Sequence, residues 1–140
     1  MKKMHKVTIL ILAILTPIVL GMILMTSNPL RQSPERIRNN LLELMPIGIS
    51  MGEVLTVIED SDRWTVRHIS EASGVLMLDG RPSTPSHLFL DDERIIGEQR
   101  IVVMLGEYRT ILMTSVVAYF AFDSNGYLLE IAIRKYTDTL

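Results

Sequence analysis

Residues 116–135 read VVAYFAFDSNGYLLEIAIRK, two apolar runs that meet at the polar segment 123–126. That segment starts with Asp-x-Asn, as calcium loops of the EF-hand kind do, but such loops need glycine at their sixth position. Here the glycine comes fourth, at Gly126, and the ligand spacing fails. Asn-Gly between two β-rich runs is typical of a hairpin with a type I′ turn, since both residues tolerate a positive φ. The stretch therefore predicts a β-hairpin and no metal site.

The two runs of this hairpin alternate in character, so each presents two sets of side chains. We expect one set to face helices, and it comprises Val116, Ala118, Phe120, Phe122, Leu129, Ile131 and Ile133. The opposite face then carries Tyr119, Glu130, Ala132 and Arg134. These four residues are either ordinary solvated positions or part of a surface that binds a partner.

Upstream of the hairpin, the chain carries the start and stop signals of two short helices. Ser33 and Pro34 fit the N-cap and first position of a helix over 34–45, which has apolar residues at helical spacing and ends at a proline. Ser50 and Glu53 have the spacing of a capping box, which predicts that a second helix starts there.

After these helices, apolar residues recur about every two residues, which is the spacing of β-strands. The segments 63–70, 74–78 and 100–105 are predicted β-strands, and the hairpin supplies two more. Helix, helix and then a mostly antiparallel meander is the order of an α+β fold. With the membrane segment described next, the predicted fold is an N-terminal transmembrane helix followed by a helical hairpin packed on a mostly antiparallel sheet.

The segment 7–25, VTILILAILTPIVLGMILM, contains 19 residues and no charge. As a helix it would span roughly 28 Å, close to the ~30 Å of bilayer hydrocarbon. The rival interpretation is a cleaved secretory signal, for which the only small pair near its end is Thr26-Ser27. We favour a retained signal anchor. A lipoprotein signal is excluded, because the chain has no cysteine to carry the lipid.

Basic residues on both sides leave the orientation of this segment nearly balanced under the positive-inside rule. Three lysines precede it and three arginines follow it: Lys2, Lys3, Lys6, Arg31, Arg36 and Arg38. A short basic start followed at once by an apolar run is typical of export signals. We therefore expect a single-pass protein of the cytoplasmic (inner) membrane, with its C-terminal domain outside the cytoplasm, that is, periplasmic.

The chain thus divides into a basic N-terminus (1–6), a transmembrane helix (7–25), a linker (26–33) and an α+β binding domain (34–140). From residue 30 onward, the 14 bases less the three N-terminal lysines leave 11, and 11 bases against 16 acids give a formal net charge of −5. This acidic balance argues against nucleic acid as a partner, because nucleic-acid binding requires a basic surface.

Residues that carry chemistry are sparse. In the long segment 79–99, His87 lies near Asp91, Asp92 and Glu93, but zinc sites need three or four ligands at tight spacing. One histidine beside an acidic run is more often a solvated loop. The sequence has no cysteine nucleophile, no Gly-x-Ser-x-Gly elbow, no phosphate-binding glycine loop and no two-histidine metal spacing. We therefore expect no metal, no cofactor and no enzymatic activity.

The segment 46–59, PIGISMGEVLTVIE, followed by strands and the C-terminal hairpin resembles the small α+β modules of the SmpA/OmlA and β-lactamase-inhibitor type. Four segments, 45–59, 106–110, 120–123 and 133–138, are also similar to small proteins grouped as immunity proteins of bacterial polymorphic toxin systems. The SmpA/OmlA branch is usually lipid-anchored through a cysteine, which this chain lacks. The resemblance therefore implies a protein partner, with a toxin as the leading candidate.

The segment GEYRT, 106–110, follows the third strand and places Glu107, Tyr108 and Arg109 at a margin of the predicted sheet. Tyrosine and arginine dominate the energetic centres of protein interfaces. With Tyr119 and Arg134 of the hairpin, these are the predicted partner-binding residues. The alternative is that Arg109 pairs with a carboxylate and Tyr108 packs under the long segment.

Together these patterns predict a membrane-anchored, non-enzymatic protein-binding domain. Its leading role is that of an immunity or inhibitor protein against a cognate toxin. The alternative is an SmpA/OmlA-like accessory component of cell-envelope assembly.

Overall fold

The structure, a computed structural model, describes residues 28–78, 81–83 and 93–138. The chain divides into two units, Met1–Arg31 and Gln32–Leu140. In the described part of the first unit, η1 is a single 3-10 turn, Pro29–Arg31, whose Leu30 N–H donates to Asn28 Oδ1 at 3.0 Å. The second unit contains all the other helices and strands described below.

Helix α2 spans Pro34–Leu44, so it starts at the predicted proline and ends one residue before the predicted limit. Ser33 caps it, since the Ser33 hydroxyl accepts a hydrogen bond from the Arg36 N–H at 3.3 Å. Ile37 and Leu41 lie one turn apart and are buried, so the helix has one apolar stripe that faces the sheet.

Helix α3 spans Met51–Glu59 and begins with the predicted capping box, which is confirmed. The Glu53 N–H donates to Ser50 Oγ at 3.3 Å, and the Ser50 N–H donates to Glu53 Oε2 at 2.9 Å. Each residue thus accepts a hydrogen bond from the backbone N–H of the other, so two N–H groups at the start of the helix have partners. Val54 and Ile58 are buried and anchor the helix to the core.

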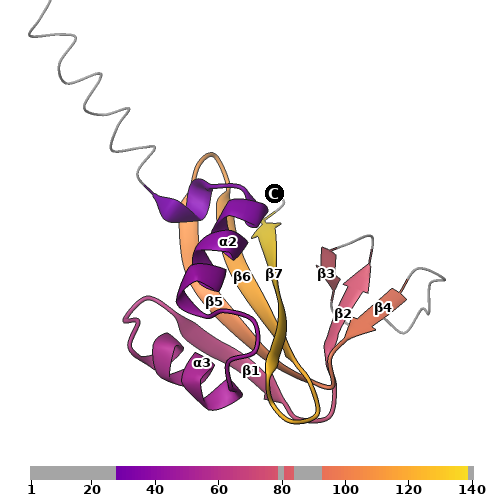
Figure 1. The fold of residues 1–140 in the computed structure, drawn as a ribbon. Helices are drawn as coiled ribbons and strands as arrows, with labels where there is room; N and C mark the ends of the chain where they lie inside the picture. Colours follow the sequence, from indigo (N-terminus) through magenta and orange to yellow (C-terminus); the bar gives the residue numbers. More distant parts are fainter. Residues whose placement is uncertain (1–27, 79–80, 84–92, 139–140) are drawn as a thin grey trace, which may run out of the picture. The chain divides into compact units, whose positions relative to one another are not determined.

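The strands form two antiparallel sheets (Figure 1). The larger sheet has the order β1-β5-β6-β7, with β1 (Thr65–Ser70), β5 (Gln99–Arg109), β6 (Met113–Phe122) and β7 (Leu128–Thr137). The smaller sheet, here called the arm, has the order β3-β2-β4, with β2 (Val75–Leu78), β3 (Arg81–Ser83) and β4 (Glu93–Ile96). Strands β1 and β7 are therefore the two outer strands of the larger sheet, and the arm lies next to β7.

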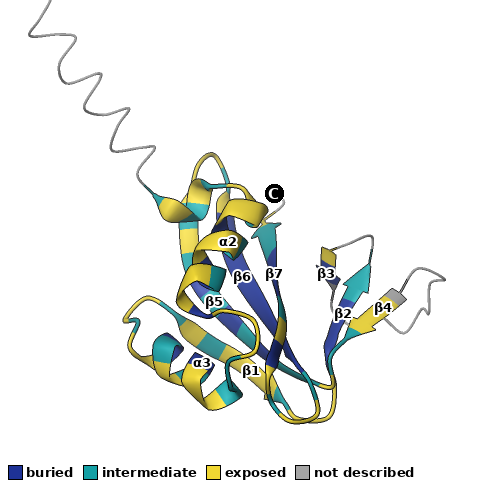
Figure 2. Ribbon diagram, viewed as in Figure 1, coloured by how far each residue is buried: buried dark blue, intermediate teal, exposed yellow. Residues whose placement is uncertain are grey.

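The larger sheet buries residues on both of its faces (Figure 2). On the face toward the helices, Ile101, Phe120 and Ile131 are paired across three strands and fully buried. On the other face Val75 of the arm packs in a cluster with Val117, Tyr119, Ala121 and Ala132. Tyr119 and Ala132 are therefore only 8% and 7% exposed. The face that we expected to be solvated or to bind a partner is instead covered by the arm at these two positions.

The hairpin between β6 and β7 exists as predicted, but its turn is not the two-residue type I′ turn. The Asp123 N–H donates to Tyr127 O at 2.9 Å, so the loop has three residues, of which Gly126 has φ +79°. Asp123 Oδ1 accepts hydrogen bonds from the Asn125 and Tyr127 N–H groups at 2.9 and 2.8 Å. The carboxylate therefore stabilises the turn.

A bulge beside this turn changes the predicted register of β7. Phe122 pairs with Leu128 and Ala121 pairs with Glu130, which leaves Leu129 as an extra residue. Leu128 is consequently buried in the core, whereas Leu129 is 43% exposed. The prediction that Leu129 belongs to the core was wrong for this reason.

The arm leaves the larger sheet where Gly74 and Gly97 pass closely. A Cβ atom on Gly74 would overlap Gly97 O, and one on Gly97 would overlap Phe122 O. Only glycine allows the backbones this close. The segment 79–99, expected to be one irregular loop, contains strands β3 and β4, while His87, Asp91 and Asp92 lie outside the described residues.

The predicted fold class has to be corrected. The described chain is mostly antiparallel sheet with two short helices, and these helices do not form a hairpin on the sheet, because α2 packs on β7 and α3 lies by β1 at the opposite edge. Within the described ranges, neither helix has the length and hydrophobicity needed to cross a bilayer. The segment 7–25, to which that role was assigned, lies outside the described residues.

Candidate functional site

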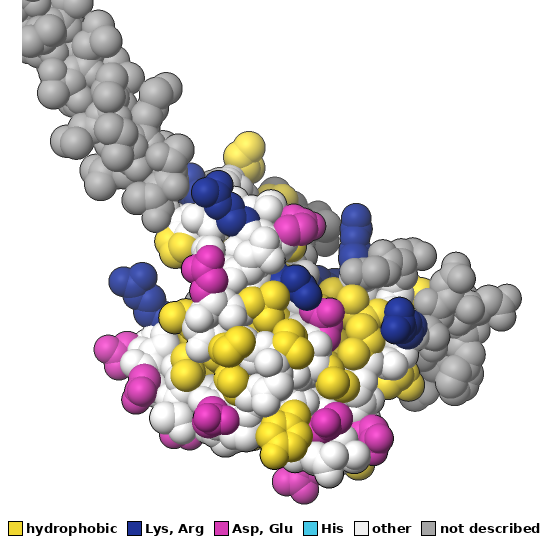
Figure 3. Space-filling model, viewed as in Figure 1, with side chains coloured by type: hydrophobic (Ala, Val, Ile, Leu, Met, Phe, Trp, Pro, Cys, Tyr) yellow, Lys and Arg dark blue, Asp and Glu magenta, His cyan; other side chains and the backbone are white. Residues whose placement is uncertain are grey.

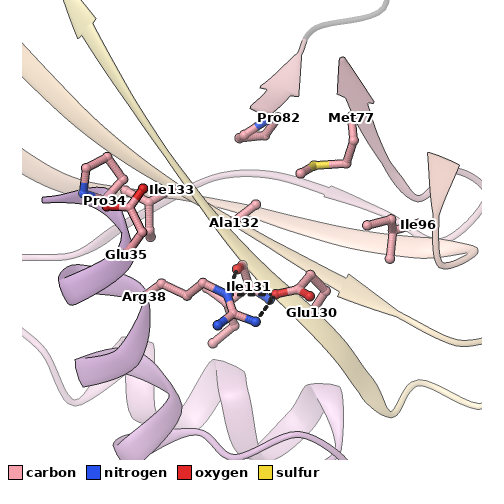
Figure 4. A pocket seen from close by; sticks show the side chains of 10 residues that line it. All are labelled: Pro34, Glu35, Arg38, Met77, Pro82, Ile96, Glu130, Ile131, Ala132 and Ile133. Carbon is pink, nitrogen blue, oxygen red and sulfur yellow. Dashed lines mark hydrogen bonds and ion pairs between the residues drawn. The ribbon is translucent and has the colours of Figure 1, made fainter. Parts of the chain in front are cut away.

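A groove runs along the outer edge of β7, between helix α2 and the arm. It encloses about 300 Å³, and Figure 4 shows side chains from all three elements converging on it. In the space-filling view, hydrophobic side chains gather between α2 and the arm, with charged side chains beside them (Figure 3). The residues that line it are Pro34, Glu35, Arg38, Met77, Pro82, Ile96, Glu130, Ile131, Ala132 and Ile133.

The start of the β7 edge is occupied by the link between the two helices. The Leu128 N–H donates to Ile49 O at 2.9 Å, and the Gly48 N–H donates to Leu128 O at 2.8 Å. A single bridge between Ser50 and Tyr127 continues this pairing. The link therefore covers the first residues of β7 as an added strand would.

The next part of the edge is closed by two charged side chains. Arg38 Nε donates to Ile131 O at 2.9 Å, and the Ile131 N–H donates to Glu130 Oε1 at 3.0 Å. The same Glu130 oxygen accepts from Arg38 Nη2 at 2.5 Å. An ion pair thus satisfies both backbone groups of Ile131 at the open edge, and charged groups of this kind protect edge strands from unwanted pairing.

Beyond Ile131, the edge of β7 faces the groove. Backbone groups of residues two apart on a strand point to the same side, so those of Ile133 point away from β6, as those of Ile131 do. Ile133 also lines both the main cavity and a second cavity that continues toward the end of the strand. The groove therefore presents a backbone donor and an acceptor at Ile133.

The arm forms one wall of the groove without pairing with β7. Pro82 of β3 lies next to β7 and has no N–H, so it cannot join the ladder. Arg134 Nη1 instead donates to Pro82 O at 2.6 Å. Pro82 therefore offers β7 no backbone donor, and the Arg134 side chain links the two sheets instead.

Charged groups surround the C-terminal end of the groove. The second cavity is lined by Pro34, Glu35, Arg81, Ile133, Arg134 and Lys135, which is three bases against one acid. The pKa of the Glu35 carboxyl is lowered by hydrogen bonds from its own backbone N–H and from Ser33, so it is ionised at neutral pH. The local balance is still basic, although the domain as a whole is acidic.

Three of the predicted partner-binding residues lie at the end of β5 and line neither cavity. Glu107 Oε1 accepts a hydrogen bond from Ser115 Oγ at 2.9 Å. The Tyr108 ring lies 5.3 Å from Lys135 Nζ, a cation–π contact. Glu107 and Arg109 are exposed, whereas Tyr108 is half-buried. Their role as partner-binding residues stays a prediction.

The other two predicted residues, Tyr119 and Arg134, meet at Tyr136. The two tyrosine hydroxyls are 2.5 Å apart, and the Arg134 guanidinium lies 4.9 Å from the centre of the Tyr136 ring. Burial and the Tyr136 hydroxyl raise the pKa of Tyr119 well above its usual range. Of the five predicted residues, Arg134 alone lines one of the two cavities.

Several groove residues were missed from the sequence, above all Arg38, Met77, Pro82 and Ile96. Strand β7 did carry a signal, since charged residues interrupt an apolar strand mainly at sheet edges. No group of histidine, cysteine and carboxylate residues able to hold a metal occurs within the described ranges. The groove has the features of a binding site: an apolar wall, an outer strand and charges at one end.

No family model, curated protein or solved structure matches this chain.

Proposed function

We propose that this domain is a non-catalytic protein-binding module that holds an extended segment of its partner along the outer edge of β7. The observation that carries the proposal is the orientation of Ile133, whose backbone groups face a groove with an apolar wall from the arm. Addition of a strand to a sheet edge gives affinity through backbone hydrogen bonds and specificity through side-chain pockets.

The biological role that we propose for this binding is immunity or inhibition against a cognate bacterial toxin. It rests on the resemblance of four segments to immunity proteins of polymorphic toxin systems, three of which include residues of β5, β6 or β7. The alternative, an accessory role in envelope assembly, stands second because the chain lacks the cysteine through which the SmpA/OmlA branch is usually lipid-anchored.

The test is site-specific photo-crosslinking with the full-length chain, coexpressed with the protein encoded beside it. A photoreactive amino acid replaces Ile96, a half-buried residue of the groove wall, or Arg63, an exposed residue outside the groove. We expect a crosslink from position 96 to the toxin, none from position 63, and survival of cells that make both proteins.

Equal crosslinking from both positions would show that the groove is not the interface. Survival without any crosslink from position 96 would retain an immunity role but place the contact elsewhere. Death of the coexpressing cells, with the chain folded and present, would remove the immunity role for that toxin.

A further inference from the structure

The edge of β7 restricts where a partner strand can pair. The helix link occupies Leu128, and the Arg38–Glu130 ion pair occupies the backbone of Ile131. An added strand therefore has its first backbone partner at Ile133. Ile133 lines both the main cavity and the second cavity, so this position lies between the apolar wall and the basic end of the groove.

This same stretch is where the basic side chains collect. Arg81 is exposed on the arm, Arg134 is held over Tyr136, and Lys135 Nζ donates to Gln32 O at 2.6 Å on the helix side. Glu35 is the one acid that lines this end. A strand that lies here passes bases on both sides, so carboxylate side chains on it are attracted and lysines are repelled.

The wall on the arm side selects for apolar side chains. Met77 and Ile96 are half-buried, line the groove and pack against the cluster under the arm. Side chains of an added strand alternate between the two faces of the sheet. Every second residue of the partner therefore meets either this apolar wall or the helix side.

We infer that the partner segment is an acidic β-strand, with both carboxylate and apolar residues, added to the edge of β7 at Ile133. The inference rests on the proposed function and specifies its ligand. The Arg38–Glu130 pair sets the point where pairing begins.

The probe is a labelled peptide, acetyl-Thr-Val-Glu-Val-Glu-Val-Thr-amide, with a counterpart in which lysine replaces both glutamates. Binding to the full-length chain is followed by fluorescence anisotropy. We expect the acidic peptide to bind at least about tenfold more tightly than the basic one, with affinity that weakens as salt is raised. Backbone N-methylation of alternate residues removes the N–H donors along one edge of the acidic peptide and should abolish binding. This control alters only the peptide and leaves the protein unchanged.

The matched protein variants are Arg81→Glu in the groove and Arg67→Glu on β1, at the opposite edge of the sheet; both arginines are exposed. Arg81→Glu should weaken binding of the acidic peptide about tenfold, and Arg67→Glu should leave it unchanged. Equal effects of the two variants would show attraction to the whole protein rather than to the groove, and would overturn the inference.

Failure of the inference can be told apart from failure of the proposed function. If the toxin crosslinks from position 96 but both peptides bind equally or not at all, the groove is the interface and its ligand is not an acidic strand. If neither peptide binds and position 96 gives no crosslink, both the inference and the groove assignment fail.

Discussion

Arg38 and Glu130 form an ion pair, 2.5 Å between Nη2 and Oε1, that joins helix α2 to the outer strand β7. Both side chains also bond to the backbone of Ile131, one to its carbonyl and one to its N–H. Unpaired strand edges are templates for association with other chains. This pair therefore both holds α2 on the sheet and closes one position of the edge.

Replacement of Arg38 by methionine keeps the apolar stem and removes the ion pair. Because the pair is about one-third exposed, we expect a loss of only about 1 kcal/mol in the free energy of unfolding. The opened edge should also make the protein associate at high concentration, measurable by sedimentation velocity. Arg36→Met, at an exposed position of the same helix, is the control and should neither lower the stability nor cause association. A monomeric and fully stable Arg38→Met variant would refute the edge-closing role.

Two glycines with positive φ differ in what surrounds them. A Cβ atom at Gly126 has no neighbour closer than 3.9 Å, whereas one at Gly97 overlaps Phe122 O. Gly126→Ala should therefore cost only the backbone strain, about 1 kcal/mol, and Gly97→Ala should cost clearly more. Thermal denaturation of the two variants measures this difference. Equal melting temperatures would show that the Gly97 backbone does not pass as close to Phe122 O as described. Chelator should change neither melting temperature.

Local signals in the sequence were enough to predict the helix starts and the hairpin. Ser33, Ser50 and Glu53 act within three residues of their own position, and Asp123 acts within four residues in the turn. The exposure of Leu129 could not be predicted in this way, because the bulge that expels it is defined only by the pairing of β6 with β7. Short alternating runs do not reveal such an extra residue.

The capping box makes stability depend on pH. Hydrogen bonds from the Ser50 hydroxyl and backbone N–H lower the pKa of the Glu53 carboxyl below its ordinary value of 4.5. A carboxyl with a lowered pKa stabilises the fold above that value, and the stabilisation is lost as pH falls through the folded-state pKa. Glu53→Gln should therefore be less stable than the wild type near neutral pH, with the difference shrinking at about pH 3. Glu59→Gln, at the exposed end of the same helix, serves as the control. A difference that stays constant with pH would contradict the prediction.

The buried tyrosine pair should produce the opposite dependence at high pH. The pKa of Tyr119 is raised above its ordinary value of 10.0, first by burial and then by the Tyr136 hydroxyl. Its contribution is therefore full below pH 10.0 and is lost as the pH rises above it, because only the unfolded chain ionises. Tyr119→Phe should reduce the loss of stability between about pH 8 and about pH 11. Tyr127→Phe, a change at a half-exposed tyrosine, should leave this loss of stability unchanged. If both variants lose stability equally over this pH range, the Tyr119–Tyr136 pair is not its cause.

The candidate site was harder to predict than the helices and turn, for a physical reason. Arg38, Met77 and Ile133 come from distant parts of the chain, and they meet only because β7 is an outer strand and the arm folds back beside it. Strand order is a property of the whole sheet, whereas the residue types favoured at interfaces directed attention to Tyr108 and Arg109. Arg134 was found by both routes, since it lies on the predicted hairpin and also lines the second cavity.

Pairing of a partner strand with β7 at Ile133 would change the hydrogen exchange of single backbone amides. The exchange rates of the full-length chain are compared by NMR with and without the acidic peptide. We predict that the Ile133 amide exchanges at least about tenfold more slowly in the complex, because its N–H gains a backbone acceptor. The Ile131 amide, already bonded to Glu130, should change little. Saturating peptide that leaves Ile133 unchanged while it protects amides elsewhere would contradict this pairing.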